Sequence, residues 1–289
     1  MSSLTDPAAQ RPRLAAVVGW PIAHSLSPLI HTTWLEQNNL KGGYIPVAVE
    51  PTKAAFRDAA DHLRGLGFQG FNVTLPHKEH ALEYCAAASE RARQAGAANM
   101  VTFTAEGAVA DNSDVTGFAA AVGNCVSAGH KFREAFVIGA GGAARGVVIA
   151  LQEMGVGSIT IANRTQAKAE TLARAFGLKT HAWSAVLTPL AETDLVINTI
   201  ALGTPDEARL AIDFDPMAAG ALIADINYIP LESALLKGAQ ARGFQTLNGL
   251  SMLMHQAAPG FEQWFAGAAR VDQDLRRLLE AALTERISP

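Results

Sequence analysis

The sequence predicts an α/β protein of two domains, one with a mostly parallel sheet and one that is doubly wound. The chain has 289 residues, about twice the roughly 150 residues of a typical domain. Short apolar runs alternate with helical stretches, which is the pattern of parallel strands joined by helices. A glycine-rich turn at residues 139–146 joins an apolar run to a helical stretch, as the first turn of a doubly wound sheet requires.

The composition is that of a globular protein. Hydrophobic residues make up 49% of the chain and charged residues 17%, which excludes a disordered polypeptide. Lys and Arg total 23 and Asp and Glu total 27, so the net charge is 23 − 27 = −4. The basic residues are scattered and form no stripe, so we expect no nucleic-acid partner.

The chain carries two cysteines, Cys85 and Cys125, without metal-ligand spacing, so we expect neither a disulfide framework nor a metal site. No run approaches the roughly 18 apolar residues that span a bilayer. The segment MSSLTDPAAQRPR is polar and has no signal-peptide core. These features predict a cytoplasmic protein without a membrane partner.

In the first part of the chain, turn residues end the predicted strands and capping residues begin the predicted helices. A helix is expected from Ser27, as the N-cap before Pro28, to about Asn39. Another is expected to follow the cap Thr52. The predicted strands are residues 14–18, 44–49 and 70–75, and after two further helical stretches residues 100–110 are expected to form a hairpin that turns near residues 106–107.

The second part alternates more regularly. The expected strands are residues 134–139, 158–162, 194–199 and 221–226, and the expected helices begin near 112 and cover 142–154, 165–176 and 231–242. Two helices are expected between residues 250 and 287. We place one domain boundary at Asp114 and a return to the first domain at Gly249, which gives domains of residues 1–113 plus 249–289 and of residues 114–248.

The glycine-rich turn has the residues that a pyrophosphate site needs. Gly139 can adopt positive φ, and Gly141 has no Cβ to obstruct a phosphate. Ala144 lets the helix pack closely on the strand, while the free N–H groups at the helix start favour an anion. The alternative is a glycine turn with a structural role only. The predicted dinucleotide-binding segment is Gly139, Ala140, Gly141, Gly142, Ala143, Ala144 and Arg145.

The end of the next strand indicates which dinucleotide binds. An NAD site places an acidic residue there, whereas this chain has Asn163 and Arg164, followed by Thr165 and Lys168. Arg164 can bind a 2′-phosphate in a fork and Lys168 adds positive charge, so NADP is the predicted cofactor. A solvated basic pair on a helix capped by Thr165 is the alternative, and both interpretations can hold together.

The first domain supplies polar side chains with the spacing of a binding site. Ser25 and Ser27 can point the same way, and Asn72 and Thr74 share one face of a strand. An exposed sheet face would also explain this second pair. Lys78 begins a helix, where a cation is electrostatically disfavoured, and it can exchange a proton with a carbonyl oxygen. Asp114 is either a helix N-cap or a carboxylate that orients Lys78.

Eight stretches in order resemble the shikimate dehydrogenase family: GWPIAHSLSPLIH, GFNVTLPHKE, GAAN, DNSD, VIGAGGAARG, ANRT, DINY and NGLSMLMHQAA. The resemblance implies a two-domain enzyme that reduces 3-dehydroshikimate to shikimate with NADPH in aromatic amino-acid synthesis, with a Rossmann-type NADP domain. The expected partner is the small-molecule substrate, and both a monomer and a homodimer stay open.

The resemblance also assigns roles by motif position. Lys78 and Asp114 match the catalytic pair. The residues that match substrate-binding positions are Ser25, Ser27, Asn72, Thr74, Asn99, Tyr228 and Gln256. Those that match cofactor-binding positions are residues 139–145, Asn163, Arg164, Thr165, Lys168 and Gly249.

Three positions depart from the family pattern. Val115 replaces a glycine after the aspartate, the loop from Ile200 to Leu202 is more apolar than usual, and Asn248 replaces an aspartate. They leave open a quinate/shikimate dehydrogenase with relaxed use of substrate, aminoshikimate included, or of cofactor. A non-catalytic module that binds NADPH is the alternative of another class, although the presence of both Lys78 and Asp114 argues against it.

Overall fold

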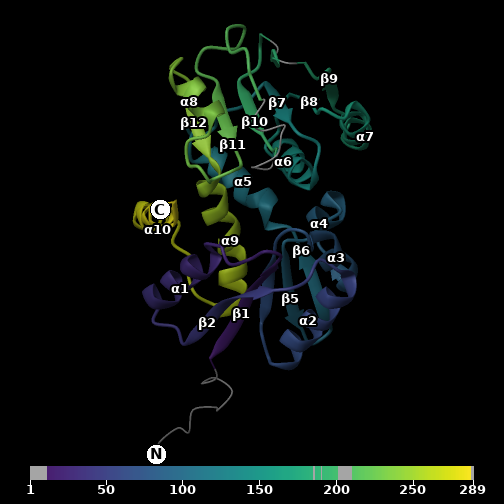
Figure 1. Ribbon diagram of the computed structural model, residues 1–289, viewed down its shortest axis with the longest axis vertical. Coiled ribbons are helices and arrows are strands. Elements are labelled where there is room, and N and C mark those ends of the chain that lie inside the picture. The colour runs from purple at the N-terminus through teal and green to yellow at the C-terminus, as the bar shows by residue number, and fades with distance from the viewer. Residues whose placement is uncertain (1–11, 185, 190, 201–209, 288–289) are drawn as a thin grey trace, which may run out of the picture. The chain divides into compact units, whose positions relative to one another are not determined.

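The computed structural model describes residues 12–184, 186–189, 191–200 and 210–287. The chain divides into two compact units, unit 1 with residues 1–113 and 257–289 and unit 2 with residues 114–256. Each unit contains a six-stranded sheet (Figure 1). The boundary proposed at residue 249 coincides with the start of helix α9 (Gly249–Phe265), whereas the division into units falls inside this helix.

The sheet of unit 1 has the strand order β2-β1-β3-β5-β6-β4. Strands β2 and β3 flank β1 in parallel, β5 runs antiparallel to β3 and β6, and β4 is parallel to β6. The predicted hairpin is the β5–β6 pair. The strands are β1 (Arg13–Gly19), β2 (Gly42–Ala48), β3 (Gly70–Val73), β4 (Ala87–Ala88), β5 (Met100–Thr104) and β6 (Gly107–Asp111). The helices are α1 (Ser27–Gln37), α2 (Lys53–Gly65), α3 (Lys78–Tyr84), α4 (Glu90–Ala95) and α10 (Gln273–Ile287), with the end of α9.

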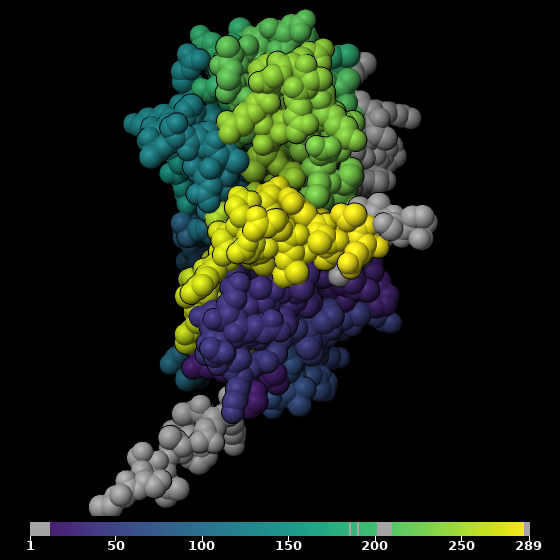
Figure 2. Space-filling model, turned by 90° about the vertical axis from the view of Figure 1, so that its left-hand side faces the viewer, coloured from purple at the N-terminus to yellow at the C-terminus, as the bar shows by residue number. Residues whose placement is uncertain are grey.

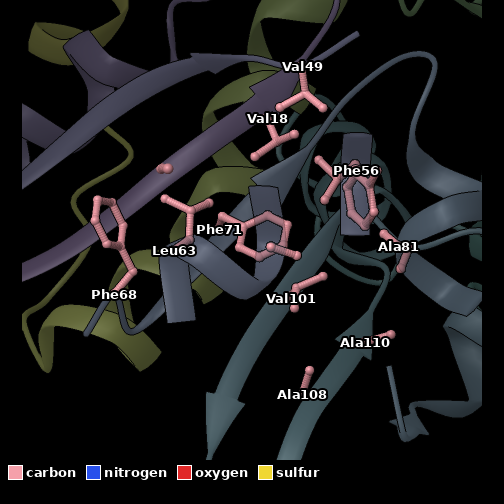
Figure 3. Packing of buried hydrophobic residues seen from close by; sticks show 14 of the residues in the cluster. Val18, Val49, Phe56, Leu63, Phe68, Phe71, Ala81, Val101, Ala108 and Ala110 are labelled. Atoms are coloured by element: carbon pink, nitrogen blue, oxygen red, sulfur yellow. The ribbon is translucent and has the colours of Figure 1, made fainter. Parts of the chain in front are cut away.

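One face of this sheet carries a hydrophobic core beneath α2. Phe71 lies among Val18, Leu63 and Val101 in the close-up (Figure 3). The rings of Phe56 and Phe71 meet edge to face with their centroids 6.0 Å apart. Thr52 accepts a hydrogen bond from the Ala55 N–H at 3.1 Å, which confirms the predicted cap of α2.

The opposite face is covered by α1 and by the end of α9, and α10 packs on α1. Trp264 of α9 is fully buried and donates its indole N–H to the Thr102 hydroxyl at 3.0 Å. A Cβ at Gly70 would lie 2.3 Å from the Trp264 Nε1, so glycine is required there. Trp34 donates to the Arg270 carbonyl at 2.8 Å. Figure 2 shows the C-terminal residues, in yellow, against the purple N-terminal part of the chain.

The sheet of unit 2 is parallel throughout, in the order β12-β11-β10-β7-β8-β9. Read from β9, this is the doubly wound order 3-2-1-4-5-6 with β7 as its first strand, so the predicted fold class is confirmed. The strands are β7 (Glu134–Ile138), β8 (Ser158–Ala162), β9 (Lys179–His181), β10 (Leu195–Asn198), β11 (Leu222–Asp225) and β12 (Gln245–Asn248). The helices are α5 (Ser113–Gly123), α6 (Gly142–Glu153), α7 (Gln166–Phe176), α8 (Ala234–Gln240) and the start of α9.

Several predicted boundaries are wrong by a few residues, for local reasons. Ser27 is the first residue of α1 and not its N-cap, which is Leu26; the Ser27 N–H is instead bound by the Ser25 hydroxyl at 3.3 Å. Strand β3 ends at Val73, so Thr74 lies just beyond it. Helix α8 begins at Ala234 because Ser233 caps it. The short strands β4, β9 and β12 were not predicted, since they lack an apolar run.

Candidate functional site

In unit 1 the predicted polar residues gather at one edge of the sheet. Ser25 and Ser27 follow β1, while Thr74 and Lys78 follow β3. Parallel strands end at the same edge, and Asn99 joins them because β5 runs antiparallel and begins where β3 ends. The Val73 N–H donates to the Asn99 carbonyl at 2.8 Å. One edge thus carries hydroxyl, amide and ammonium groups.

Asn72 is buried at this edge, with both ends of its amide engaged. Tyr44 of β2 donates its hydroxyl to the Asn72 Oδ1 at 2.7 Å. The Asn72 Nδ2 donates to the Asn99 carbonyl at 3.3 Å. Asn72 therefore does not lie on an exposed sheet face, and the alternative explanation fails for this residue. A tyrosine on a strand carries no sequence signal for this contact, which is why sequence reasoning missed Tyr44.

Asn99 holds the start of α5. Its Oδ1 accepts from the Ser113 N–H at 2.7 Å, and its Nδ2 donates to the Ser113 hydroxyl at 3.0 Å. Asn112 is held in turn, since its Nδ2 donates to the Ala97 carbonyl at 3.0 Å. Asp114 follows Ser113 in the chain, and its side chain is half-buried. Ser113, which sequence reasoning also missed, is the residue through which Asn99 fixes this turn.

The backbone of Lys78 is anchored from two sides. Its carbonyl accepts from the Ala98 N–H at 2.8 Å. The preceding residue, His77, is fully buried, and its Nε2 lies 2.9 Å from the Val49 carbonyl while its Nδ1 lies 3.1 Å from Nδ1 of His80. The Lys78 side chain itself is half-buried. The main chain thus holds the lysine at the sheet edge independently of its own ammonium group.

In unit 2 the glycine-rich turn has the predicted geometry. Gly139 adopts φ +107°, and a Cβ there would lie 2.4 Å from the Thr199 Oγ1. Gly141 is the N-cap of α6, and a Cβ at Gly141 or Gly142 would meet no described atom within 4 Å. Ala144 is fully buried against the sheet. The exposed start of a 12-residue helix is thus open to an anion, which fits the pyrophosphate of a dinucleotide.

Basic residues follow the neighbouring strand. Strands β7 and β8 end side by side, with Ile138 paired to Ala162. The Asn163 Nδ2 donates to the Thr165 carbonyl at 2.9 Å and shapes the turn that exposes Arg164 and, one helical turn later, Lys168. Thr165 is the N-cap of α7 but makes no side-chain cap hydrogen bond. These two exposed cations fit a 2′-phosphate.

Arg145 is held differently from these two cations. Its guanidinium lies 5.6 Å from the centroid of the Phe176 ring. Its side chain is half-buried.

The remaining predicted residues of unit 2 have different surroundings. Tyr228 is half-buried after β11. A Cβ at Gly249 would lie 1.9 Å from the Ile226 carbonyl oxygen, so close backbone approach requires this glycine. Gln256 packs on α5, where a Cβ at Gly117 would lie 2.6 Å from its own Cβ.

Three residues that depart from the family pattern, or lie in a segment that does, fall in the described part of the chain, and each fits its surroundings. Val115 is fully buried. The Ile200 carbonyl accepts from Nδ2 of Asn227 at 2.8 Å, and Asn248 donates to the Leu231 carbonyl at 3.2 Å. Residues 201 and 202 lie outside the described residues.

Within the described part of the chain, no group of three or more His, Cys, Asp or Glu side chains is arranged to hold a metal ion. Among the same residues, no helix has the length and apolar character needed to cross a membrane.

Comparison with known proteins identifies relatives of both units. Residues 17–101 match the family described as shikimate dehydrogenase substrate binding domain, and residues 125–209 match shikimate / quinate 5-dehydrogenase. The chain is 45% identical to the NADP(+) shikimate dehydrogenase of Acidiphilium cryptum, over 94% of this chain and 97% of the relative. The corresponding enzyme of Nitrobacter winogradskyi is 43% identical over 94% and 97%.

Solved structures share the fold. The 5-ketofructose reductase of a Gluconobacter strain has a TM-score of 0.83 at 28% identity and covers 96% of this chain and 100% of its own. The shikimate dehydrogenase of Thermus thermophilus in complex with NADP(H) and shikimate has a TM-score of 0.79 at 31% identity, with coverages of 95% and 100%.

Proposed function

The chain belongs to the shikimate dehydrogenase family, and we propose that it reversibly reduces 3-dehydroshikimate to shikimate with NADPH, a step toward chorismate and the aromatic amino acids. The observation that carries this proposal is the 45% identity with an NADP(+) shikimate dehydrogenase over 94% of the chain. The proposal includes a cytoplasmic setting and a monomer or homodimer. Most of the proposed substrate-binding residues belong to unit 1, and the proposed cofactor-binding residues belong to unit 2.

The residues of unit 2 fit NADP. The N–H groups of residues 139–145 would hold the pyrophosphate at the start of α6. Arg164 and Lys168 would bind the 2′-phosphate, with Asn163 and Thr165 forming the turn between them. The family motif also assigns Gly249 to the cofactor site, although its close approach to the Ile226 carbonyl already requires glycine at this position. When bound, NADPH supplies the hydride.

The predicted substrate-binding residues would hold the substrate, and the predicted catalytic pair would move its proton. Ser25 and Ser27 hydroxyls donate to the substrate carboxylate. The remaining polar groups serve the ring and its hydroxyls, and they are Asn72, Thr74, Asn99, Asp114, Tyr228 and Gln256. Lys78 gives a proton to the oxygen at C3 and takes it back in the reverse direction, oriented by Asp114.

A comparison of substrates tests this function. We expect the highest kcat/KM for shikimate with NADP among shikimate, quinate, aminoshikimate and fructose, each assayed with NADP and NAD in the oxidative direction. Equal or higher kcat/KM for quinate would favour the quinate/shikimate dehydrogenase. Preferred oxidation of fructose would favour the activity of the Gluconobacter relative. Tight NADPH binding without turnover of any of these would favour a non-catalytic module.

Gly141→Ala tests the pyrophosphate site separately from the fold. At φ −89° and with no described neighbour within 4 Å of its Cβ, alanine fits at this position. The free energy of unfolding is expected to change by less than about 1 kcal/mol, because the smaller entropy of the unfolded chain and the poorer N-cap oppose each other. The methyl group would obstruct the phosphate, so the Kd for NADPH should rise about tenfold or more. Titration of NADPH fluorescence measures this, with Gly123→Ala, another open position in unit 2, as the control. An unchanged Kd would contradict the assignment of this loop.

A further inference from the structure

We propose that Tyr44 is a positioning residue that turns the amide of Asn72 so that it faces the substrate as a hydrogen-bond donor; this inference rests on the function proposed above. Nothing in the motifs of the family resemblance includes Tyr44, which belongs to the middle of β2. The inference concerns which atom of Asn72 the substrate meets, and therefore which group of the substrate Asn72 can recognise.

The contacts of Asn72 allow one orientation of its amide. The Asn99 carbonyl can only accept a hydrogen bond, so the atom that faces it at 3.3 Å must be the Asn72 Nδ2. The Oδ1 then faces Tyr44, whose hydroxyl donates to it at 2.7 Å. With its oxygen engaged by Tyr44 and one Nδ2 hydrogen given to the Asn99 carbonyl, Asn72 has one amide hydrogen left for a ligand. A ring hydroxyl oxygen of the substrate can accept from this group.

Tyr44 is a fixed and permanent donor. Its ring stacks on the imidazole of His31 with centroids 3.8 Å apart and planes 6° apart, and both residues are buried. Burial raises the pKa of Tyr44 well above its ordinary value, although a hydrogen bond with Ser27 opposes the shift. Burial also lowers the pKa of His31 to about 3. At neutral pH the phenol therefore stays protonated and the imidazole beneath it stays uncharged.

Tyr44 also connects two parts of the predicted site. Ser27 begins α1, and Asn72 lies on β3, on the other side of β1 from β2. The Tyr44 hydroxyl gives its single proton to Asn72, and the Ser27 side chain opposes the rise in the pKa of Tyr44. The Tyr44 side chain therefore interacts with residues from both parts of the predicted site.

Tyr44→Phe removes the donor and keeps the ring on His31. We expect the KM for shikimate to rise about tenfold, because the amide of Asn72 loses the shorter of the two hydrogen bonds that fix its direction and keeps only the one to the Asn99 carbonyl. The kcat should change by less than about threefold, and the KM for NADP should be unchanged, because Tyr44 acts on Asn72, which in the proposed function neither moves the proton nor binds the cofactor. Tyr84→Phe is the matched control, since Tyr84 in the same unit donates to Asp61 Oδ1 at 2.8 Å on an exposed surface.

A double-mutant cycle separates positioning from a general effect on structure. In an Asn72→Ala background, Tyr44→Phe should cause no further rise in KM. Equal rises with and without Asn72, or a KM within twofold of wild type for Tyr44→Phe alone, would overturn this inference and leave the proposed function intact. A wild-type protein that does not oxidise shikimate would overturn the proposed function and this inference with it.

Discussion

Lys78→Ala is expected to lower the kcat for shikimate oxidation by about 10²–10⁴-fold, the contribution of a positioned acid–base group. The KM for shikimate should change less, because other polar groups at the same sheet edge would still bind the substrate. Steady-state kinetics with NADP and shikimate measure both constants.

The fold should survive this substitution. The contact that anchors Lys78 is made by its carbonyl, which accepts from the Ala98 N–H, and alanine keeps it. His77 is held by its own ring contacts. A thermal unfolding midpoint equal to that of the wild-type protein would show that the lower kcat comes from the lost ammonium group and not from partial unfolding.

Lys53→Ala is the control for Lys78→Ala. Lys53 lies in the same unit, at the start of α2, where its ammonium pairs with Glu83 at 2.6 Å on the surface. Surface ion pairs contribute at most about 1 kcal/mol, so this variant should keep its kcat. If Lys78→Ala turned over shikimate at nearly the wild-type kcat, another group would have to supply the proton.

Features set by neighbours in sequence could be predicted well. The cap Thr52 and the positive φ of Gly139 depend on a few adjacent residues, and both predictions are confirmed. The doubly wound sheet followed from apolar runs at regular spacing. Short-range geometry leaves a pattern in the sequence because each strand or turn must satisfy its own backbone.

Features set by the pairing of distant strands could not be predicted. Asn99 reaches the candidate site because β5 runs antiparallel beside β3, and no local pattern records that direction. The Tyr44–Asn72 contact spans two strands that both pair with β1. The neighbour Pro28 predicts Ser27 as an N-cap, whereas in the structure the Ser27 N–H donates to the Ser25 hydroxyl. Sequence reasoning found most of the candidate side chains but not the hydrogen bonds that orient them.

Arg164→Asp is expected to reduce the preference for NADP over NAD by about tenfold to hundredfold, which is the value of one charge-assisted hydrogen bond. An aspartate at this position would also repel a 2′-phosphate, while it could bond the 2′-hydroxyl of NAD. The kcat/KM for shikimate oxidation with each cofactor measures the change. Because Arg164 is exposed and the turn is shaped by the Asn163–Thr165 hydrogen bond, the substitution should leave the fold unchanged.

Arg174→Asp makes the same change of charge at the other end of α7, so it separates a specific contact from the general field of the domain. Arg174 is exposed, and its Nη2 lies 3.5 Å from the Thr171 hydroxyl. If only the general electrostatic field of the domain favoured NADP, both variants would reduce the preference for NADP over NAD by similar factors. If Arg164 contacts the 2′-phosphate, only Arg164→Asp reduces the preference for NADP over NAD. Lys168→Ala should then reduce this preference by a smaller factor in the Arg164→Asp background than in the wild-type protein. Equal losses with NADP and NAD in Arg164→Asp would mean that this residue does not distinguish the two cofactors, and that the choice is made elsewhere in unit 2.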